Sequence, residues 1–297
     1  MLYSMNIKSP LRYPGGKSRA IKQILPIVPS FDEYREPMVG GGSVFFALFQ
    51  KYPNKKYWIN DINRDLYLFW KYCKEDMEGL VSEVTRIKNT YANGRALFTE
   101  LTDGKKDFTD FERAVRFFVL NRITFSGTIE SGGYSEQSFN GRFTDSSIKR
   151  LEDIKELLSN VEITNLDYQK IINEDGKNVF IFLDPPYLST KKSKLYGKNG
   201  DLHELFDHEQ FAENMKQCKH KWLITYDNSP EVKKLFSFAN IYEWELQYGM
   251  NNYKQTSASK GQELFISNYE IPILKCKKIA FEIDSSIKSL NINKIEI

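Results

Sequence analysis

An apolar run at Val179–Leu183 is the feature that most constrains how this 297-residue chain can fold. A strand that is apolar at every position has both faces buried, as in a parallel sheet with helices on both sides. The motif Asp184-Pro185-Pro186-Tyr187 follows at once, and its prolines cannot donate to a strand ladder. The sequence therefore predicts a central parallel strand that ends in polar residues, at the edge where open α/β sheets bind ligands.

Helices and strands alternate around this central strand, which supports an α/β fold class. Before it, the patterns are a helix at 18–27, a strand that feeds a glycine turn at 40–42, a helix at 44–49 and a strand at Lys56–Asn60. Later patterns are strands at Val161–Thr164, 221–226 and 264–266, and a helix at 206–218. This order indicates a parallel sheet with crossover helices.

Between residues 66 and 159 the alternation stops and helical patterning prevails. The clearest helix covers 111–120, with its apolar positions on one side and Arg113, Arg116 and Arg122 on others. We therefore predict a core domain formed by 1–65 and 160–297, interrupted by a mostly helical inserted subdomain at 66–159.

Composition excludes several other classes of protein. The net charge of +3 is only mildly basic, which is compatible with nucleic-acid binding but does not indicate it. The three cysteines (Cys73, Cys218 and Cys276) are far apart, so neither a disulfide framework nor a metal site is expected. No apolar stretch reaches the length of a membrane-spanning helix, about 18 residues, and the N-terminus lacks a signal-peptide core. We expect a cytoplasmic protein that binds neither a metal ion nor a membrane.

The motif at 184–187 suits chemistry on an amino group. The Asp184 carboxylate and a proline carbonyl can both accept hydrogen bonds from one amino group. Two such acceptors favour an available nitrogen lone pair, and they stabilise the positive charge that develops when the nitrogen attacks a methyl group. Tyr187 can stack on the base that carries the amino group and hold it in line. The competing interpretation is a plain Pro-Pro turn, which the position directly after a buried strand disfavours.

The glycine turn at 40–42 and Asp61, which follows the next strand, indicate a nucleoside-type ligand. Glycines let a ligand approach the backbone, and an acid after the second strand can bind ribose hydroxyls. The same pattern suits an NAD-dependent oxidoreductase, but three consecutive glycines differ from the G-x-G-x-x-G pattern of dinucleotide sites.

Several motifs occur together in a fixed order. They are Leu11-Arg12-Tyr13-Pro14-Gly15-Gly16-Lys17, Glu36-Pro37-Met38-Val39-Gly40-Gly41-Gly42-Ser43, Asn60-Asp61-Ile62-Asn63, Asn121-Arg122-Ile123-Thr124-Phe125-Ser126-Gly127, Asn165-Leu166-Asp167-Tyr168, Asp184-Pro185-Pro186-Tyr187 and Glu263-Leu264-Phe265-Ile266-Ser267-Asn268-Tyr269. The set resembles the DNA adenine methylase (Dam) family over roughly residues 9 to 270. The resemblance implies a Rossmann-like core that binds S-adenosylmethionine, with an inserted DNA-recognition region. It also implies methyl transfer to the exocyclic amino group of an adenine that is flipped out of duplex DNA.

The resemblance further implies which residues form the site. The cofactor would be held by Tyr13, Gly16, Lys17, Pro37, Gly40, Gly42, Asp61, Asp167, Tyr168 and Asp184. Among these, Lys17 suits the methionine carboxylate, Asp61 the ribose, and Asp167 with Tyr168 the adenine of the cofactor. The catalytic residues would be Asp184, Pro185, Pro186 and Tyr187.

The residues expected to contact DNA are Arg12, Arg122, Phe125, Ser126, Glu130, Lys191 and Lys192. Phe125 lies where the family has an aromatic wedge that fills the space left by the flipped base, and the two lysines suit phosphates. Ser126 and Glu130 replace an asparagine and an arginine that read bases in GATC-specific members. Glutamate accepts from the cytosine amino group, whereas arginine pairs with guanine. We therefore expect a recognition sequence other than GATC.

Other functions stay open at this point. Methylation of the 4-amino group of cytosine uses the same geometry, although such enzymes more often have serine in place of Asp184. Methylation of RNA fits the wedge aromatic less well. A DNA-binding relative without activity is disfavoured by the intact 184–187 motif and by Lys17. A cognate restriction endonuclease that acts on the same site is a partner compatible with the resemblance.

Overall fold

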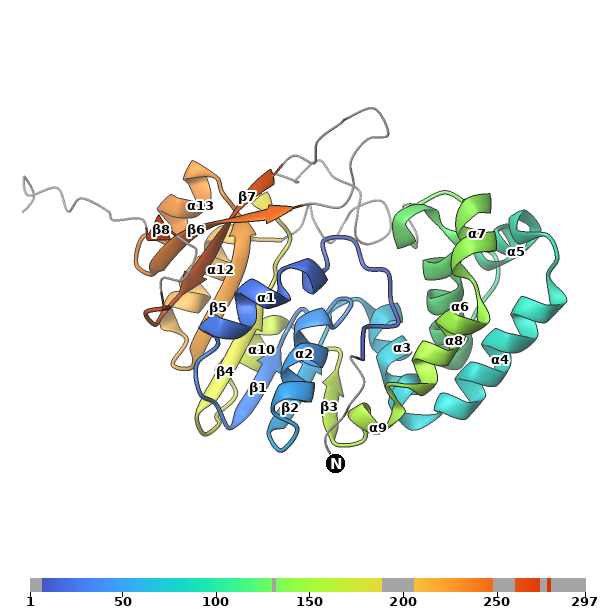
Figure 1. Ribbon diagram of the computed structural model, residues 1–297, viewed down its shortest axis with the longest axis horizontal. Helices are drawn as coiled ribbons and strands as arrows, with labels where there is room; N and C mark the ends of the chain where they lie inside the picture. Colours follow the sequence, from blue (N-terminus) through green and yellow to red (C-terminus); the bar gives the residue numbers. More distant parts are fainter. Residues whose placement is uncertain (1–6, 130–131, 189–205, 248–259, 273–276, 279–297) are drawn as a thin grey trace, which may run out of the picture.

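One mixed β-sheet forms the centre of the molecule (Figure 1). The computed structural model describes residues 7–129, 132–188, 206–247, 260–272 and 277–278. Within these residues the sheet has eight strands in the order β3-β2-β1-β4-β5-β7-β6-β8. The strands are β1 (Glu33–Glu36), β2 (Lys56–Asn60), β3 (Val161–Thr164), β4 (Val179–Leu183), β5 (Lys221–Asp227), β6 (Asn240–Gln247), β7 (Lys260–Ser267) and β8 (Lys277–Lys278).

Most of the predicted strands are confirmed. β2, β3 and β4 have the predicted bounds, β5 extends the prediction to Asp227, and β7 begins earlier than the predicted 264–266. β6 and β8 are not among the predicted strands. β6 alternates apolar and polar residues, a strand signal that the sequence interpretation overlooked. β8 has only two residues, and it is defined by its pairing with β6 rather than by any pattern of its own.

The strand order reverses between β1 and β4. β1 pairs in parallel with β2 on one side and with β4 on the other, while β3 and β5 extend the parallel part outward. β7 then runs antiparallel between β5 and β6. Ligands of open α/β sheets bind at the carboxyl ends of the strands next to such a reversal, so this topology selects the ends of β1 and β4.

Helices cover both faces of the sheet. The side chains of β4 alternate between two apolar clusters, one on each face. Val179, Ile181 and Leu183 pack with α10 (Tyr168–Asn173), α12 (His208–Gln217) and α13 (Pro230–Leu235). Phe180 and Phe182 join the other cluster, which contains α1 (Ile21–Ile24) and α2 (Ser43–Lys51). The prediction of a central strand buried on both faces is therefore confirmed, and with it the α/β class.

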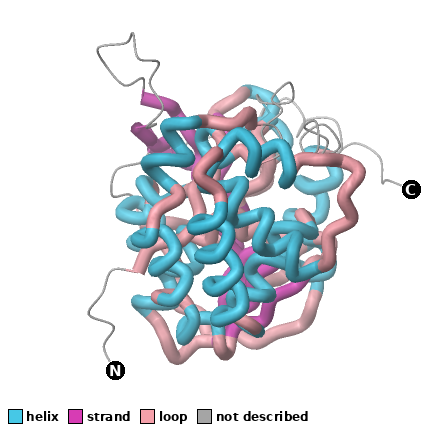
Figure 2. The backbone as a smooth tube through the Cα atoms, turned by 90° about the vertical axis from the view of Figure 1, so that its right-hand side faces the viewer, coloured by secondary structure: helices cyan, strands magenta, loops and turns pink. Residues whose placement is uncertain are grey.

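The described residues between β2 and β3 contribute helices but no strand to the sheet. The helices are α3 (Arg64–Glu75), α4 (Met77–Thr90), α5 (Gly94–Leu101), α6 (Asp110–Ile123), α7 (Glu136–Arg142), α8 (Asp145–Glu152) and α9 (Lys155–Leu158). Figure 2 views the molecule from this helical side, with the strands behind. No helix in the described ranges is both long and apolar enough to cross a membrane.

α6 is the central helix of this region, and it confirms the helix predicted at 111–120. It begins at a capping box in which Thr109 and Glu112 bond each other's backbone N–H groups. Its Phe117 and Phe118 stack on Phe69 of α3, with ring centroids 5.8 and 5.9 Å apart. These rings belong to the same apolar cluster as Phe180 and Phe182, so the helical region and the sheet share one core.

The helix predicted at 18–27 is divided into short turns. The segment forms a 3₁₀ turn at Lys17–Arg19, then α1, then a second 3₁₀ turn at Leu25–Ile27 that contains Pro26. Proline lacks the N–H that a longer helix would need, which explains the break. The helices predicted at 44–49 and 206–218 are confirmed as α2 and α12.

Candidate active site

A pocket of about 750 Å³ lies at the carboxyl ends of β1 and β4, where the strand order reverses. This volume is typical of sites for small molecules and cofactors. All of the residues that the resemblance assigns to the cofactor and to catalysis line it: Tyr13, Gly16, Lys17, Pro37, Gly40, Gly42, Asp61, Asp167, Tyr168, Asp184, Pro185, Pro186 and Tyr187. The fold thus gathers into one cavity residues that lie far apart in the sequence.

The glycine turn after β1 needs glycine for two reasons. Gly40 and Gly42 have φ values of +48° and +69°, which L side chains rarely adopt. In addition, a Cβ atom at Gly40 would lie 2.8 Å from the Tyr13 ring, and one at Gly41 would lie 2.7 Å from the Tyr13 Cβ. The turn therefore packs closely against the 10–17 loop and places Tyr13 at the wall of the pocket.

Asp61 ties this turn to the end of β2. Its Oδ2 accepts a hydrogen bond from the Gly40 N–H at 3.0 Å, and its Oδ1 accepts one from the Asn63 N–H at 3.0 Å. Burial raises the pKa of Asp61 to about 6, although these two bonds act in the opposite direction. Each carboxylate oxygen has a second acceptor position, so Asp61 can bind a hydroxyl group as well as hold the turn.

Asp184 is held by two donors, one on each carboxylate oxygen. The Lys17 ammonium lies 2.6 Å from Oδ2, and the Thr225 hydroxyl donates to Oδ1 at 2.7 Å. Lys17 is 5 % exposed and also donates to the Gly15 carbonyl at 3.0 Å. A lysine ammonium has three N–H donors, so one remains for a ligand.

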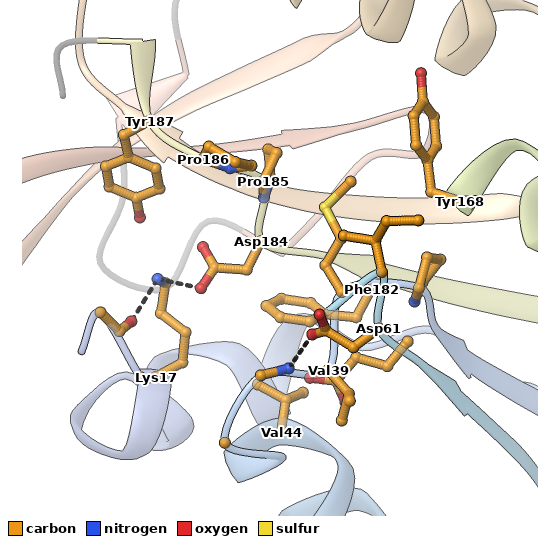
Figure 3. A pocket seen from close by; sticks show the side chains of 18 of the residues that line it. Lys17, Val39, Val44, Asp61, Tyr168, Phe182, Asp184, Pro185, Pro186 and Tyr187 are labelled. Carbon is orange, nitrogen blue, oxygen red and sulfur yellow. Dashed lines mark hydrogen bonds and ion pairs between the residues drawn. The ribbon is translucent and has the colours of Figure 1, made fainter. Parts of the chain in front are cut away.

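Tyr187 completes the surroundings of this ammonium. Its ring centroid lies 5.1 Å from Lys17 Nζ, within the range of a cation–π interaction. Figure 3 shows the Lys17 ammonium beside the Asp184 carboxylate and below the Tyr187 side chain, with Asp61 and its bond to the glycine turn farther along the pocket. A carboxylate oxygen and an aromatic ring that together face a cationic nitrogen form an arrangement suited to an amino group that gains positive charge.

Two buried acids of the pocket, Glu36 and Glu263, are absent from the predicted site residues. Burial raises the pKa of Glu36 to about 8; Asp184 and Asp61 add to this rise, and the Tyr34 hydroxyl opposes it. Burial likewise raises the pKa of Glu263 to about 7, and the nearby charge of Lys17 opposes that rise. Both acids stand in the quoted motifs, but only the fold shows that they reach the pocket. A positively charged ligand in the pocket would favour the ionised form of both acids and so oppose the rise in their pKa.

Glu36→Gln should make the stability of the protein less dependent on pH. Because the folded state raises the pKa of Glu36 from 4.5 to about 8, folding favours the protonated acid, and stability falls as pH rises through that window. Glutamine has no charge to bury and keeps an oxygen that accepts from Tyr34. We expect the variant to melt several degrees above the unmodified protein at pH 9, with the difference shrinking toward pH 5. Thermal melts across this range test the effect, with Glu162→Gln at an exposed position as the control. Equal pH slopes for Glu36→Gln and the unmodified protein would contradict it.

The turn after α6 displays Phe125, whose side chain is 67 % exposed. Ser126 beside it has a positive φ of 54°, and Gly127 one of 75°. A Cβ atom at Gly127 would lie 2.3 Å from the Arg12 carbonyl oxygen, so only glycine fits. The Asn121 side chain accepts from the Arg12 N–H at 3.0 Å and donates to its carbonyl at 2.7 Å. Arg12, Phe125 and Ser126 are thereby brought together beside the pocket loop.

Arg122, which is among the residues predicted to contact DNA, is buried in this structure. Its side chain is 2 % exposed, and its guanidinium donates to the Pro10 carbonyl. Arg122 therefore fastens the 10–12 segment to α6, next to the bonds made by Asn121. Glu130, Lys191 and Lys192, the remaining predicted DNA contacts, lie outside the described residues.

The known proteins that this chain resembles are DNA methyltransferases, in agreement with a pocket suited to chemistry on an amino group. The family model described as D12 class N6 adenine-specific DNA methyltransferase matches residues 13–250. The Type II methyltransferase M.MjaIII of Methanocaldococcus jannaschii is 30% identical over 213 residues, which cover 65% of this chain and 73% of the relative. The Type II methyltransferase M1.LlaDCHI of Lactococcus lactis subsp. cremoris is 26% identical over 285 residues, 89% of this chain and 96% of the relative. A DNA adenine methylase of Vibrio cholerae is 24% identical over 200 residues, 64% of this chain and 70% of the relative.

Proposed function

The chain belongs to the D12 class of N6 adenine-specific DNA methyltransferases. From this premise we propose that it transfers a methyl group from S-adenosylmethionine to the amino group of a flipped-out adenine, which Asp184 holds. The adenine-specific family does not favour the alternative of cytosine methylation. The proposal depends on one observation: Asp184 Oδ2 and the Tyr187 ring both lie close to the same cationic nitrogen, Lys17 Nζ.

The pocket residues fit this cofactor by their chemistry. The third N–H of Lys17 suits the methionine carboxylate, Asp61 suits the ribose hydroxyls, and Asp184 suits a positive sulfonium. Ile62 and Leu166 also line the pocket and are 54% and 41% exposed, so they offer apolar contacts to an adenine ring. When bound, S-adenosylmethionine supplies a methyl group on a positively charged sulfur, which leaves as the neutral sulfide S-adenosylhomocysteine.

In this proposal the chain's own residues prepare the amino group for attack. The Asp184 carboxylate and the Pro185 carbonyl accept hydrogen bonds from the two N–H groups of the adenine amino group. These bonds free the nitrogen lone pair and stabilise the positive charge that develops. Tyr187 stacks on the base, and base–aromatic stacking returns about 1–3 kcal/mol of the cost of flipping. We propose direct transfer without a covalent enzyme intermediate: the two cysteines within the described residues, Cys73 and Cys218, are buried and do not line the pocket.

We assign DNA recognition to the helical region at 66–159, together with the 10–12 segment. Exposed Phe125 is the candidate wedge that enters the space left by the flipped adenine, and Arg12 and Ser126 lie beside it. Glu130, Lys191 and Lys192 stay in the proposal on the resemblance alone. Because Ser126 and Glu130 replace base-reading residues of GATC-specific members, we propose a different recognition sequence. A restriction endonuclease with the same site is the proposed partner, in keeping with the Type II names of two relatives.

The test is methylation of genomic DNA that lacks adenine methylation, using purified protein and S-adenosylmethionine, with the products mapped by single-molecule sequencing. We expect N6-methyladenine within one short motif other than GATC. Reactions without the cofactor serve as the control. Modified cytosines would overturn the assignment of the base, and modified GATC sites would overturn the proposed specificity.

A further inference from the structure

Thr225 on β5 contacts the catalytic carboxylate directly. Its hydroxyl donates to Asp184 Oδ1 at 2.7 Å, and its side chain is fully buried. The contact follows from the sheet: β4 and β5 are parallel with Leu183 opposite Ile224, so the next residue on each strand continues the pairing. Side chains alternate along both strands, so Asp184 and Thr225 lie on the same face as Phe182 and Leu223.

The two oxygens of Asp184 are held from different sides. Thr225 binds Oδ1 from within the sheet, whereas Lys17 binds Oδ2 from the pocket. The terminal torsion of an aspartate side chain is soft, so a carboxylate with a single partner can rotate. Lys17 is also the residue suited to the methionine carboxylate, and an amino group that approaches Oδ2 competes with it. Thr225 is the partner that has no such competitor.

We propose that Thr225 is a positioning residue for methyl transfer: its hydroxyl fixes the plane of the Asp184 carboxylate so that Oδ2 faces the target amino group. This inference rests on the proposed function, because it assigns that carboxylate to the adenine. Thr225 touches neither the base nor the cofactor in this role. It acts through Asp184, and an error of about 1 Å in the position of a catalytic group can cost about 10²-fold in rate.

The variant Thr225→Val removes the hydroxyl and keeps the branched shape that suits a strand. Under single-turnover conditions we expect methyl transfer to slow by about 10- to 100-fold. The affinities for S-adenosylmethionine and for the duplex should change by less than about threefold, since the binding contacts remain. Thr225→Ser restores the hydroxyl and should recover most of the rate, and Thr225→Ala should be as slow as Thr225→Val.

A second measurement separates positioning from general damage to the fold. A duplex with 2-aminopurine at the target position reports base flipping by its fluorescence, and this base has no 6-amino group for Asp184 to hold. We expect equal fluorescence increases for the unmodified protein and Thr225→Val, with melting temperatures measured alongside.

Three outcomes would overturn the inference. The first is an unchanged transfer rate in Thr225→Val or Thr225→Ala. The second is a loss in Thr225→Ser as large as in Thr225→Val. The third is a loss of rate that runs in parallel with lost flipping or lost folding. Failure of the unmodified protein to methylate any adenine would instead overturn the proposed function, and this inference with it.

Discussion

Replacing Asp184 with asparagine should slow methyl transfer by about 10²–10³-fold, the effect typical of removing one electrostatic contact to a charge that develops in the transition state. Asparagine keeps the shape of the side chain and one oxygen for Lys17. The Thr225 hydroxyl can accept from the new amide as readily as it donates to the carboxylate. The substitution therefore removes the negative charge that faces the amino group and pairs with Lys17, while both contacts of the carboxylate keep a hydrogen bond. Single-turnover methylation with enzyme in excess measures the rate, and calorimetry measures the affinity for S-adenosylmethionine.

Asp227→Asn is the matched control for this substitution. Asp227 lines the same pocket, is 8% exposed, and accepts from the Leu188 N–H at 2.9 Å, a bond that asparagine preserves. We expect its rate to stay within about tenfold of the unmodified protein, because Asp184 is the acid that faces the amino group. Equal losses in the two variants would indicate a general effect of pocket charge. A normal rate in Asp184→Asn would remove Asp184 from the catalytic assignment.

The parts of the site that the sequence predicts are those encoded within short segments. An apolar strand that ends in Asp-Pro-Pro-Tyr, and a glycine turn before a helix, carry their geometry in neighbouring residues. Parallel strands then bring both carboxyl ends to one edge of the sheet, so Asp61 and Asp184 could be expected in one pocket. The same reasoning cannot reveal the Thr225 contact, because it depends on which strands are neighbours and on their register.

The burial of Arg122 shows a second limit of sequence reasoning. A helix with one apolar stripe buries that stripe and exposes its opposite face to solvent. α6 does not follow this rule, since its last seven residues, from Phe117 to Ile123, are all buried among other helices and the 10–12 segment. The charge of Arg122 suggested a surface position, but one of its guanidinium nitrogens donates to a backbone carbonyl inside the protein. Its pKa is lowered by burial and by the nearby charges of Arg12, Arg150 and Arg142.

Arg35 fixes β1 relative to the segment that leads into β4. Its side chain is 1% exposed, and its Nε lies 2.6 Å from Glu33 Oε1. The other guanidinium nitrogens donate to the carbonyls of Ile171, Glu174 and Asp175 at 2.6 to 2.9 Å. The guanidinium presents several donors in one rigid plane, so no other side chain can replace all of these bonds. β1 and β4 carry the two halves of the pocket, which makes Arg35 a structural link beneath the site.

Arg35→Met should therefore lower the free energy of unfolding by about 3–5 kcal/mol, because buried Glu33 loses its arginine partner and the buried Ile171 carbonyl loses a donor. Lys56→Met is the matched control: Lys56 pairs with the same Glu33 at 3.4 Å but is 80% exposed, and such surface pairs contribute about 1 kcal/mol or less. Guanidinium unfolding of both variants gives the comparison. Adding Glu33→Gln to Arg35→Met should recover part of the loss, since the buried charge that lost its arginine is then gone. A loss of less than about 1 kcal/mol in Arg35→Met, or no recovery in the double variant, would show that the stability of β1 depends on packing rather than on this buried network.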